Sequence, residues 1–313
     1  MDHTDYFIEL HTGQKMPMIG LGTWKSEPEK VKEAVEYAVV DAGYRHIDCA
    51  SIYKNEKEIG EAFHHIFESK KVTREELFVT SKLWNTDHAK DDVVRACKQT
   101  LHDLQLEYLD LYLVHWCIAS SSTPVPDPVD DHGFLITEKI SMRETWEAME
   151  NLVHQGFVKA IGVANFTAPM LFEILSFATI PPAVNQIELH PYNQQQGLVD
   201  FCQYNNIPVT AYSSLGSPGN AKGQGDMLIL LEDPTVQHIA QTYKKSAAQV
   251  LLRWGIQRNT IVIPKSVTKE NIQRNVEIFD FELSLDDMTA LSQLERHHRY
   301  VDPFGWWKIP YFG

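Results

Sequence analysis

The sequence has 313 residues, of which 43% are hydrophobic and 22% are charged, a globular composition that is neither disordered nor fibrous. Its formal net charge of -14 disfavours nucleic acid and anionic membranes as partners, so an anionic ligand would need a local group of cations. We therefore expect a small-molecule partner, with no nucleic acid and no membrane.

The start of the chain, MDHTDYFIEL, lacks the basic and apolar regions of a secretory signal, and no apolar run is long enough to span a bilayer. The cysteines form neither a C-x-x-C pair nor a spacing typical of zinc ligands. These features predict a cytoplasmic protein without a structural disulfide. The cysteines are Cys49, Cys97, Cys117 and Cys202.

A β-hairpin is expected in the segment FIELHTGQKMPMI, with its turn at Gly13. After it, short β-rich runs alternate with longer stretches whose apolar residues recur at helical spacing. Each such stripe can pack one face of a helix against a sheet. Two of these stripes are Val31, Ala34, Val35, Ala38 and Val39, and Val93, Ala96, Cys97, Thr100, Leu101 and Leu104.

Eight apolar runs are expected to be strands, and they are apolar enough to be buried on both faces. In chain order they are MIGLGTW, HIDCA, LFVTSKLW, LDLYLVHW, KAIGVAN, VNQIEL, PVTAYSS and NTIVIPKS. Eight strands alternating with helices predict an α/β fold, the (β/α)8 TIM barrel. Because no Pro-, Gly- or Ser-rich linker divides the chain, we predict one domain over residues 1–313, with a hairpin region at 1–17 and a C-terminal tail at 295–313.

Two segments depart from the repeat. Residues 117–141 follow the fourth strand and residues 216–229 follow the seventh. Loops of this length are usually functional, so we expect both to cover one mouth of the barrel.

A doubly wound nucleotide-binding fold is the main alternative, because GLGTWK begins like a dinucleotide fingerprint. Gly20 and Gly22 supply the first two glycines, but Lys25 occupies the third position, where a close helix contact would require glycine. The barrel is therefore favoured.

Polar side chains stand at the carboxyl ends of three neighbouring strands, where barrel active sites form. Asp48 and Tyr53 follow the second strand, Lys82 ends the third and His115 ends the fourth. Each alone could have an ordinary structural role: Asp48 as a cap, Tyr53 as a half-buried aromatic, Lys82 as a solvated strand end and His115 as a histidine at the barrel rim. Together they predict a catalytic site.

The set makes chemical sense without a metal. A tyrosine has a pKa of about 10 in water, and a neighbouring ammonium such as Lys82 lowers that pKa, which eases proton donation. Asp48 can pair with Lys82, and His115 can orient a carbonyl and stabilise its developing negative charge. A barrel hydrolase would instead need a carboxylate pair or metal cluster at the strand ends, which we do not find. The pairs His64–His65 and His297–His298 have no further ligand at a recognisable spacing.

At this point the sequence resembles the aldo-keto reductase family, near its aldose and xylose reductases. The resemblance covers essentially the whole chain, through GLGTW, DAGYRHIDCASIYKNE, VTSKLWN, LDLYLVHW, GVANF, VNQIELHPY, TAYSSLGS and IPKSVT. It implies NADPH-dependent reduction of aldehydes and aldoses, with Tyr53 as general acid, Asp48 and Lys82 tuning it and His115 orienting the substrate. Since relatives also serve as channel subunits or lens proteins, a cofactor-binding regulatory or structural homologue with little turnover is the alternative.

The resemblance also implies a cofactor site. Asn165 and Gln186 would hydrogen-bond the nicotinamide carboxamide, and Tyr212 would stack on its ring. The helix after PKSVT would present its N-terminal amides to the 2'-phosphate. The complete cofactor set is Gly22, Thr23, Trp24, Asn165, Gln186, Tyr212, Ser213, Leu215, Ser217, Lys265, Ser266, Val267, Thr268, Asn271, Arg274 and Asn275.

Three departures from the family pattern concern the cofactor. Asn271 stands where many NADPH-preferring members carry an arginine, so one bidentate cation is missing. Arg274 occupies a position often held by a glutamate that accepts from the adenine. Gly219 replaces an aspartate that latches a loop over the cofactor in some relatives. We expect NADPH to be preferred, with NADH use possible and cofactor held less tightly.

The expected substrate pocket has an apolar wall around Tyr53 and His115, which suits small aldehydes and xylose-like sugars. The tail DPFGWWKIPYFG resembles that of xylose reductases, so Trp306 or Trp307 is expected to reach the pocket. The sequence does not distinguish a monomer from a homodimer. The wall residues are Trp24, Ile52, Trp116 and Trp306.

Overall fold

The computed structural model describes residues 5–123, 125–218 and 228–312. Most of the expected loop at 216–229, Gly219 included, lies outside these residues. Among the described helices, none has the length and apolar character needed to cross a membrane.

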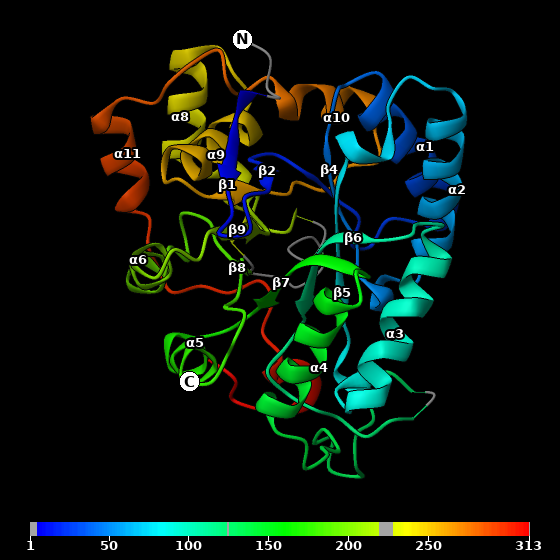
Figure 1. Ribbon diagram of the computed structural model, residues 1–313. Coiled ribbons are helices and arrows are strands. Elements are labelled where there is room, and N and C mark those ends of the chain that lie inside the picture. The colour runs from blue at the N-terminus through cyan, green and yellow to red at the C-terminus, as the bar shows by residue number, and fades with distance from the viewer. Residues whose placement is uncertain (1–4, 124, 219–227, 313) are drawn as a thin grey trace.

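The predicted hairpin and all eight predicted strands are present (Figure 1). The hairpin strands β1 and β2 pair antiparallel, and the turn between them contains Gly13 in the left-handed region at φ +81°. The other strands form one parallel sheet in chain order. The strands are β1 Phe7–Glu9, β2 Lys15–Pro17, β3 Leu21–Gly22, β4 His46–Asp48, β5 Phe78–Leu83, β6 Leu109–Val114, β7 Val158–Ala164, β8 Asn185–Glu188, β9 Val209–Tyr212 and β10 Ile261–Val262.

The sheet closes on itself, because its last strand also bonds to the first. The Gly20 amide donates to the Val262 carbonyl at 2.9 Å, and the Val262 amide donates to the Met18 carbonyl at 2.9 Å. A parallel bridge joins Gly22 to Lys265 one step further along. This closure confirms the (β/α)8 barrel and excludes the doubly wound alternative, whose sheet is open.

Helices surround the sheet, and Figure 1 shows α1, α2 and α3 together on one side of the strands. The stripe predicted from Val31 to Val39 is wholly buried on α1, and all members of the α3 stripe are buried except Ala96, which is half-buried. The helices are α1 Pro28–Val40, α2 Glu56–Glu68, α3 Lys90–Asp103, α4 Met142–His154, α5 Ala168–Leu175, α6 Gln196–Tyr204, α8 Pro234–Tyr243, α9 Ala247–Gln257, α10 Lys269–Val276, α11 Leu285–Ser292 and α12 Phe304–Trp307.

The barrel interior is apolar at one end and polar at the other. Leu10 and Met16 of the hairpin segment pack with Phe78 and Leu111 in one buried cluster, so the hairpin plugs the apolar end. Lys82 lies four residues after Phe78 on β5, hence on the same inward face. The strands therefore carry the inward-facing charges away from the plug, to their carboxyl ends.

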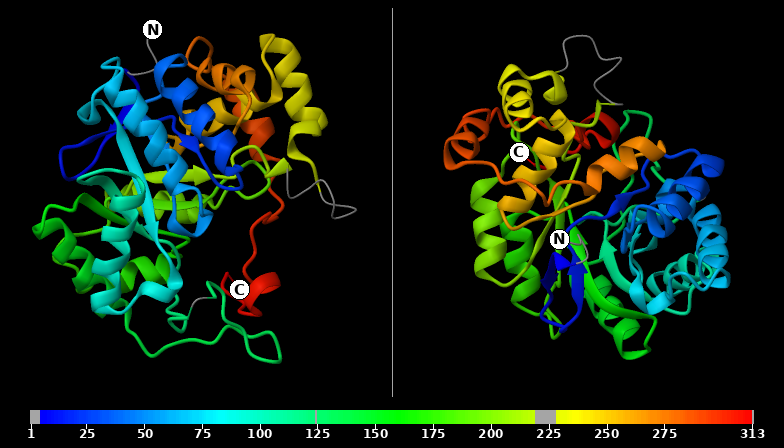
Figure 2. Two further views of the ribbon diagram at one scale, coloured as in Figure 1. Left: turned by 90° about the vertical axis from the view of Figure 1, so that its right-hand side faces the viewer. Right: turned by 90° about the horizontal axis from the view of Figure 1, so that it is seen from above.

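The C-terminal tail lies against the long loop that follows β6. The loop carries two short antiparallel bridges, Val129 to Leu135 and Ser120 to Thr137. The Leu135 amide donates to the Trp307 carbonyl at 3.2 Å, and the left view of Figure 2 shows α12 beside this loop. We propose that the chain is a single domain, since hairpin and tail both contact the barrel.

A glycine in α2 tests the packing of the helical layer. A Cβ on Gly60 would overlap the backbone carbonyl oxygen of Asp103 at the end of α3, whereas a Cβ on Gly197 in α6 has nothing within 4 Å. We expect Gly60→Ala to lower the free energy of unfolding by about 2 kcal/mol through overpacking. Gly197→Ala, the matched control, should leave it unchanged or raise it by up to about 1 kcal/mol. Urea unfolding of both variants measures this, and equal effects would contradict the close contact.

Candidate active site

The polar end of the barrel is built around a buried ion pair. The Lys82 ammonium donates to Asp48 Oδ1 at 2.6 Å, to the Cys49 carbonyl at 2.8 Å and to the Tyr53 hydroxyl at 3.3 Å. The Lys82 and Asp48 side chains are 0% and 2% exposed. Burial lowers the pKa of Lys82, but attraction to Asp48 and Tyr53 outweighs it and raises that pKa overall. The ammonium is therefore charged at neutral pH and held against the phenol.

Short local elements deliver these groups to one place. Strand β4 ends at Asp48, and a 3-10 turn over Ser51–Tyr53 brings the phenol back over the strand end. The Thr23 hydroxyl donates to the Asp48 carbonyl at 2.8 Å, and the buried Asn55 amide donates to the Thr23 carbonyl at 3.0 Å. The first two strand ends are thus tied together beneath the site.

The pKa of Tyr53 reflects two opposing effects. Burial raises the pKa of Tyr53 to about 12, while the Lys82 ammonium acts to lower it. Lys82 thus works in the expected direction, but burial and the Asp48 charge outweigh it, so the net shift is upward. The phenol therefore carries its proton throughout the neutral range, as a proton donor must.

His115 faces the phenol as a neutral base. Its ring centroid lies 6.0 Å from that of Tyr53 and 5.1 Å from that of Trp84. Burial, and then the Lys82 charge, hold the pKa of His115 well below its usual range. A neutral imidazole can donate one hydrogen bond to a carbonyl oxygen without adding a charge.

The expected nicotinamide ligands lie next to the ion pair. Gln186 Nε2 donates to Asp48 Oδ2 at 2.8 Å, so both oxygens of that carboxylate are engaged. The Tyr212 hydroxyl donates to Asn165 Oδ1 at 2.7 Å, and Asn165 Nδ2 donates to the His115 carbonyl at 3.0 Å. These bonds fix the two amides and the Tyr212 ring at the mouth.

Three residues of the expected cofactor site have left-handed backbones, which are costly for residues other than glycine. They are Asn165, Ser213 and Ser217, with φ values of 64°, 51° and 42°. The Ser213 and Ser217 hydroxyls hydrogen-bond each other at 2.6 Å, which helps to hold these two residues in the left-handed conformation.

The far end of the groove suits an anion. Lys265 lines it, and no carboxylate of the described chain lies within ion-pair distance of its ammonium. Burial lowers the pKa of Lys265. Ser266 and Thr268 stand just before α10, and the Ser266 hydroxyl accepts from the Thr268 amide at 3.2 Å. An exposed ammonium, hydroxyls and a helix N-terminus fit the phosphates of a nicotinamide dinucleotide.

One pocket of about 620 Å³ joins these parts. Most residues of the predicted site line it. Lys82 lies beneath it, Arg274 pairs with Glu270 at 2.6 Å on the surface, and Asn275 is buried in α10. The predicted residues that line it are Asp48, Tyr53, His115, Gly22, Thr23, Trp24, Asn165, Gln186, Tyr212, Ser213, Leu215, Ser217, Lys265, Ser266, Val267, Thr268, Asn271, Ile52, Trp116 and Trp306.

The substrate end of the pocket is aromatic. The rings of Trp116 and Trp306 stand nearly perpendicular, at 88° and 6.5 Å between centroids. Trp307 does not line the pocket; it is fully buried and supports Trp116 from behind at 5.3 Å. The tail therefore supplies one wall tryptophan and one supporting tryptophan.

Sequence reasoning missed Trp84, Asp127 and Val301, which also line the pocket. Trp84 carried a signal, because it follows Lys82 by two residues and strand alternation places both on one face. Asp127 and Val301 lie on the long loop and the tail, where no periodicity exists to place them.

A buried carboxylate that the sequence analysis also missed anchors the tail. Glu188 Oε1 accepts from the Tyr300 amide at 2.6 Å and lies 3.0 Å from His190 Nε2, while Oε2 accepts from the Val301 amide at 3.2 Å. Glu188 lies at the end of β8, two residues after Gln186. The strand that carries Gln186 thus also anchors the start of the tail.

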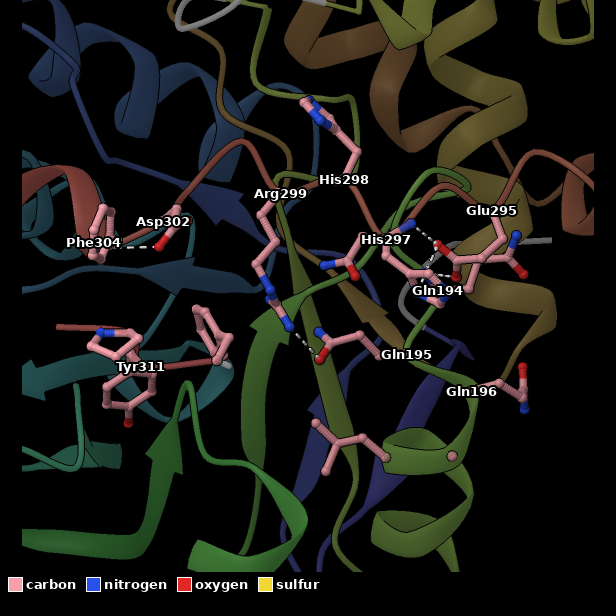
Figure 3. A pocket seen from close by; sticks show the side chains of 15 residues that line it. Gln194, Gln195, Gln196, Glu295, His297, His298, Arg299, Asp302, Phe304 and Tyr311 are labelled. Atoms are coloured by element: carbon pink, nitrogen blue, oxygen red, sulfur yellow. Dashed lines mark hydrogen bonds and ion pairs between the residues drawn. The ribbon is translucent and has the colours of Figure 1, made fainter. Parts of the chain in front are cut away.

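A larger cavity, of about 1000 Å³, lies between the tail and residues 193–198 (Figure 3). None of the four predicted catalytic residues lines it. Its Glu295 carboxylate accepts from the amides of Gln194, Arg296 and His297, and Arg299 donates to Gln195 Oε1 at 3.0 Å. These bonds hold the outer side of the tail.

None of the paired histidines lines the 620 Å³ pocket, although His297 and His298 line the larger cavity. Among the described residues, no group of three or more histidine, cysteine, aspartate or glutamate side chains could hold a metal ion.

The anchoring role of Glu188 predicts a specific kinetic defect. In Glu188→Gln an amide N–H would face a backbone N–H, so we expect the unfolding free energy to fall by about 2 kcal/mol. The aldehyde KM should rise, because Val301 lines the pocket. Glu295→Gln is the control: the Glu295 carboxylate accepts from three backbone amides and does not line this pocket, so the variant should lose stability without a change in KM. Steady-state kinetics and thermal unfolding of both variants measure this. If Glu188→Gln and Glu295→Gln had the same KM, the proposed role of Glu188 in holding the pocket wall would be refuted.

Comparison with known proteins identifies the family. Residues 18–296 match the Aldo/keto reductase family. The chain is 52% identical over 297 residues to human aldo-keto reductase family 1 member A1, covering 95% of this chain and 91% of that protein, and 51% identical to its Cricetulus griseus counterpart over the same shares. The structure of aldose reductase from Schistosoma japonicum superimposes with a TM-score of 0.90 at 40% identity, over 98% and 97% of the two chains. That of Bombyx mori aldo-keto reductase in complex with NADP gives 0.89 at 38% identity, over 98% of each. The chain therefore belongs to the aldo/keto reductase family of oxidoreductases.

Proposed function

We propose that this protein reduces aldehydes and aldoses to alcohols with NADPH, with Tyr53 as the proton donor. The observation that carries the proposal is the buried Lys82–Asp48 pair, whose ammonium lies 3.3 Å from the Tyr53 hydroxyl in a pocket that continues to an anion-binding groove. A binding protein without turnover has no need for a buried charge against a phenol, since burying such a pair is costly.

The chain's own residues hold the carbonyl and supply the proton. The cofactor, when bound, supplies a hydride to the carbonyl carbon. Tyr53 and neutral His115 donate hydrogen bonds to the carbonyl oxygen, and as negative charge develops there Tyr53 transfers its proton to it. Lys82, held in place by Asp48, stabilises the phenolate that remains.

Asn165, Gln186 and Tyr212 have a binding role in this proposal. The bond from Tyr212 to Asn165 and the bond from Gln186 to Asp48 hold two amides and one ring at the same mouth as Tyr53. Fixed amides position the carboxamide of a nicotinamide, and a fixed ring decides which face of it is presented to the substrate.

The preference for NADPH over NADH is also proposed. Support comes from Lys265, which has no carboxylate partner in the described chain, and from the hydroxyls that precede α10. Asn271 lines the groove without a charge, and Arg274 is engaged by Glu270. With Lys265 as the cation of this groove and no additional arginine, we predict that the protein prefers NADPH over NADH less strongly than members that carry that arginine.

Replacing the proposed acid tests the function. We expect the wild type to oxidise NADPH with glyceraldehyde and xylose, and Tyr53→Phe to lose at least about 100-fold in kcat while binding NADPH unchanged, because only the donated proton is removed. Steady-state kinetics and fluorescence titration measure this. Wild-type binding without turnover would support the regulatory or structural alternative. The same assay with NADH gives the cofactor ratio, and equal efficiencies would contradict the preference.

The pKa shifts predict the pH profile of reduction. Because the pKa of His115 lies well below its usual range, His115 stays neutral, and because the pKa of Tyr53 is raised to about 12, Tyr53 stays protonated. We therefore expect neither residue to produce an inflection in kcat/KM between about pH 6 and about pH 9, with a fall only at higher pH as Tyr53 ionises. An acid limb near pH 6.5 that disappears in His115→Asn would show that His115 is charged instead.

Two expectations stay predictions from the sequence. The cytoplasmic location rests on the lack of a secretory signal and on the cysteine spacing, and the oligomeric state is predicted to be a monomer or a homodimer. A small-molecule substrate is consistent with the pocket volume of about 620 Å³.

A further inference from the structure

Among the described residues, the pocket is lined by a second carboxylate besides Asp48, and it is fixed in place. Asp127 lines the pocket, and its Oδ1 accepts a hydrogen bond from Trp307 Nε1 at 2.9 Å. The preceding Pro126 carbonyl accepts from Trp84 Nε1 at 2.7 Å. Residues 126 and 127 are therefore held between two tryptophans, one of which packs on His115 at 5.1 Å.

One oxygen of this carboxylate is free for a ligand. Oδ1 is bonded to Trp307, and within the described chain Asp127 Oδ2 has no hydrogen-bond or ion-pair partner. Burial raises the pKa of Asp127, while the Trp307 bond and the Lys54 charge lower it. Lys54, the nearest cation, is exposed and not within ion-pair distance.

Three tryptophan side chains line the same pocket as Asp127. Trp84, Trp116 and Trp306 line this end, and the Trp116 and Trp306 rings meet nearly at right angles. Trp306 is 46% exposed, so part of its surface is open to a ligand. Indole faces attract cations through their quadrupole, and perpendicular indoles beside a carboxylate form the kind of cage that binds ammonium groups.

The cations that line the pocket are placed elsewhere. Lys265 lies at the phosphate end beside Ser266, and Lys25 lies over the Trp24 ring at 4.5 Å. Lys25 occupies the Trp24 face, which leaves the other three tryptophans for the substrate. An anionic substituent at the substrate end would instead meet Asp127 across an apolar wall, which is unfavourable.

We propose that Asp127 and the three tryptophans select aldehydes that carry a positively charged ammonium group and disfavour those that carry a carboxylate. This inference rests on the proposed reductase function and names the substrate class for it. Asp127 acts on the substituent remote from the carbonyl, so it is a specificity residue. Its effect should therefore appear in KM and leave kcat nearly unchanged.

Three para-substituted benzaldehydes of matched shape test the charge selection. They carry a trimethylammonium group, a tert-butyl group or a carboxylate, and the first two are isosteric. We expect Asp127→Asn to lower kcat/KM for the ammonium aldehyde by about tenfold and to raise kcat/KM for the carboxylate aldehyde by about threefold. For the tert-butyl aldehyde, which carries no charge, kcat/KM should change by less than about twofold. Asparagine keeps an acceptor for Trp307, so the fold is preserved, and comparing enzymes on each substrate cancels differences in carbonyl reactivity.

Lys54→Gln is the matched control. Removing this neighbouring cation should raise kcat/KM for the ammonium aldehyde and lower it for the carboxylate aldehyde, opposite to the effects of Asp127→Asn. The factors should be smaller than for Asp127→Asn because Lys54 is exposed. If the wild type reduces all three aldehydes and Asp127→Asn changes kcat/KM by the same factor for each, charge selection is refuted and the reductase function stands. If the wild type reduces none of them, the proposed function fails and this inference fails with it.

Discussion

The rest of the site depends on one buried ion pair inside a closed barrel. Lys82 and Asp48 come from the neighbouring strands β5 and β4, and their contact at 2.6 Å is shielded from water inside the barrel. Burying each charge costs several kcal/mol, which the pair offsets through mutual attraction and through bonds to Gln186 and the Cys49 carbonyl. Removing any partner would leave an uncompensated charge, so the geometry around Tyr53 is strongly constrained.

Two halves of the pocket are stabilised in different ways. The proposed cofactor half is formed by strand ends and by residues in strained left-handed conformations, which the barrel holds rigidly. The proposed substrate half is formed by the long loop and the tail, which are held by hydrogen bonds from Trp307 Nε1 to Asp127 and from the Cys117 amide to the Tyr311 hydroxyl. Glu188 joins the halves, since its strand carries Gln186 and its carboxylate binds the tail. A fixed cofactor site beside a changeable wall lets one chemistry serve different substrates.

Burial explains where simple pairwise reasoning about the site falls short. A lysine beside a tyrosine lowers the pKa of the phenol in isolation, but in this structure burial is the larger effect and raises it to about 12. His115 shows the same dominance of burial, which keeps the imidazole neutral. Contact between two groups can be inferred from strand ends, whereas the net electrostatic outcome depends on how much water the folded barrel excludes.

The sequence by itself determined the barrel and the residues at its mouth, because strand and helix periodicity are local properties and the carboxyl ends of parallel strands converge. Asp48, Tyr53, Lys82 and His115 could be assigned in this way, and so could Trp84 by alternation. Only the tertiary structure decided how the ring of strands closes and that Arg274 faces away from the groove. It also decided that Trp306 lines the pocket while Trp307 supports the pocket wall. Asp127 and Glu188 gain their roles from contacts 180 and 112 residues distant in sequence. Such contacts follow no local period, so the sequence pattern carries no sign of them.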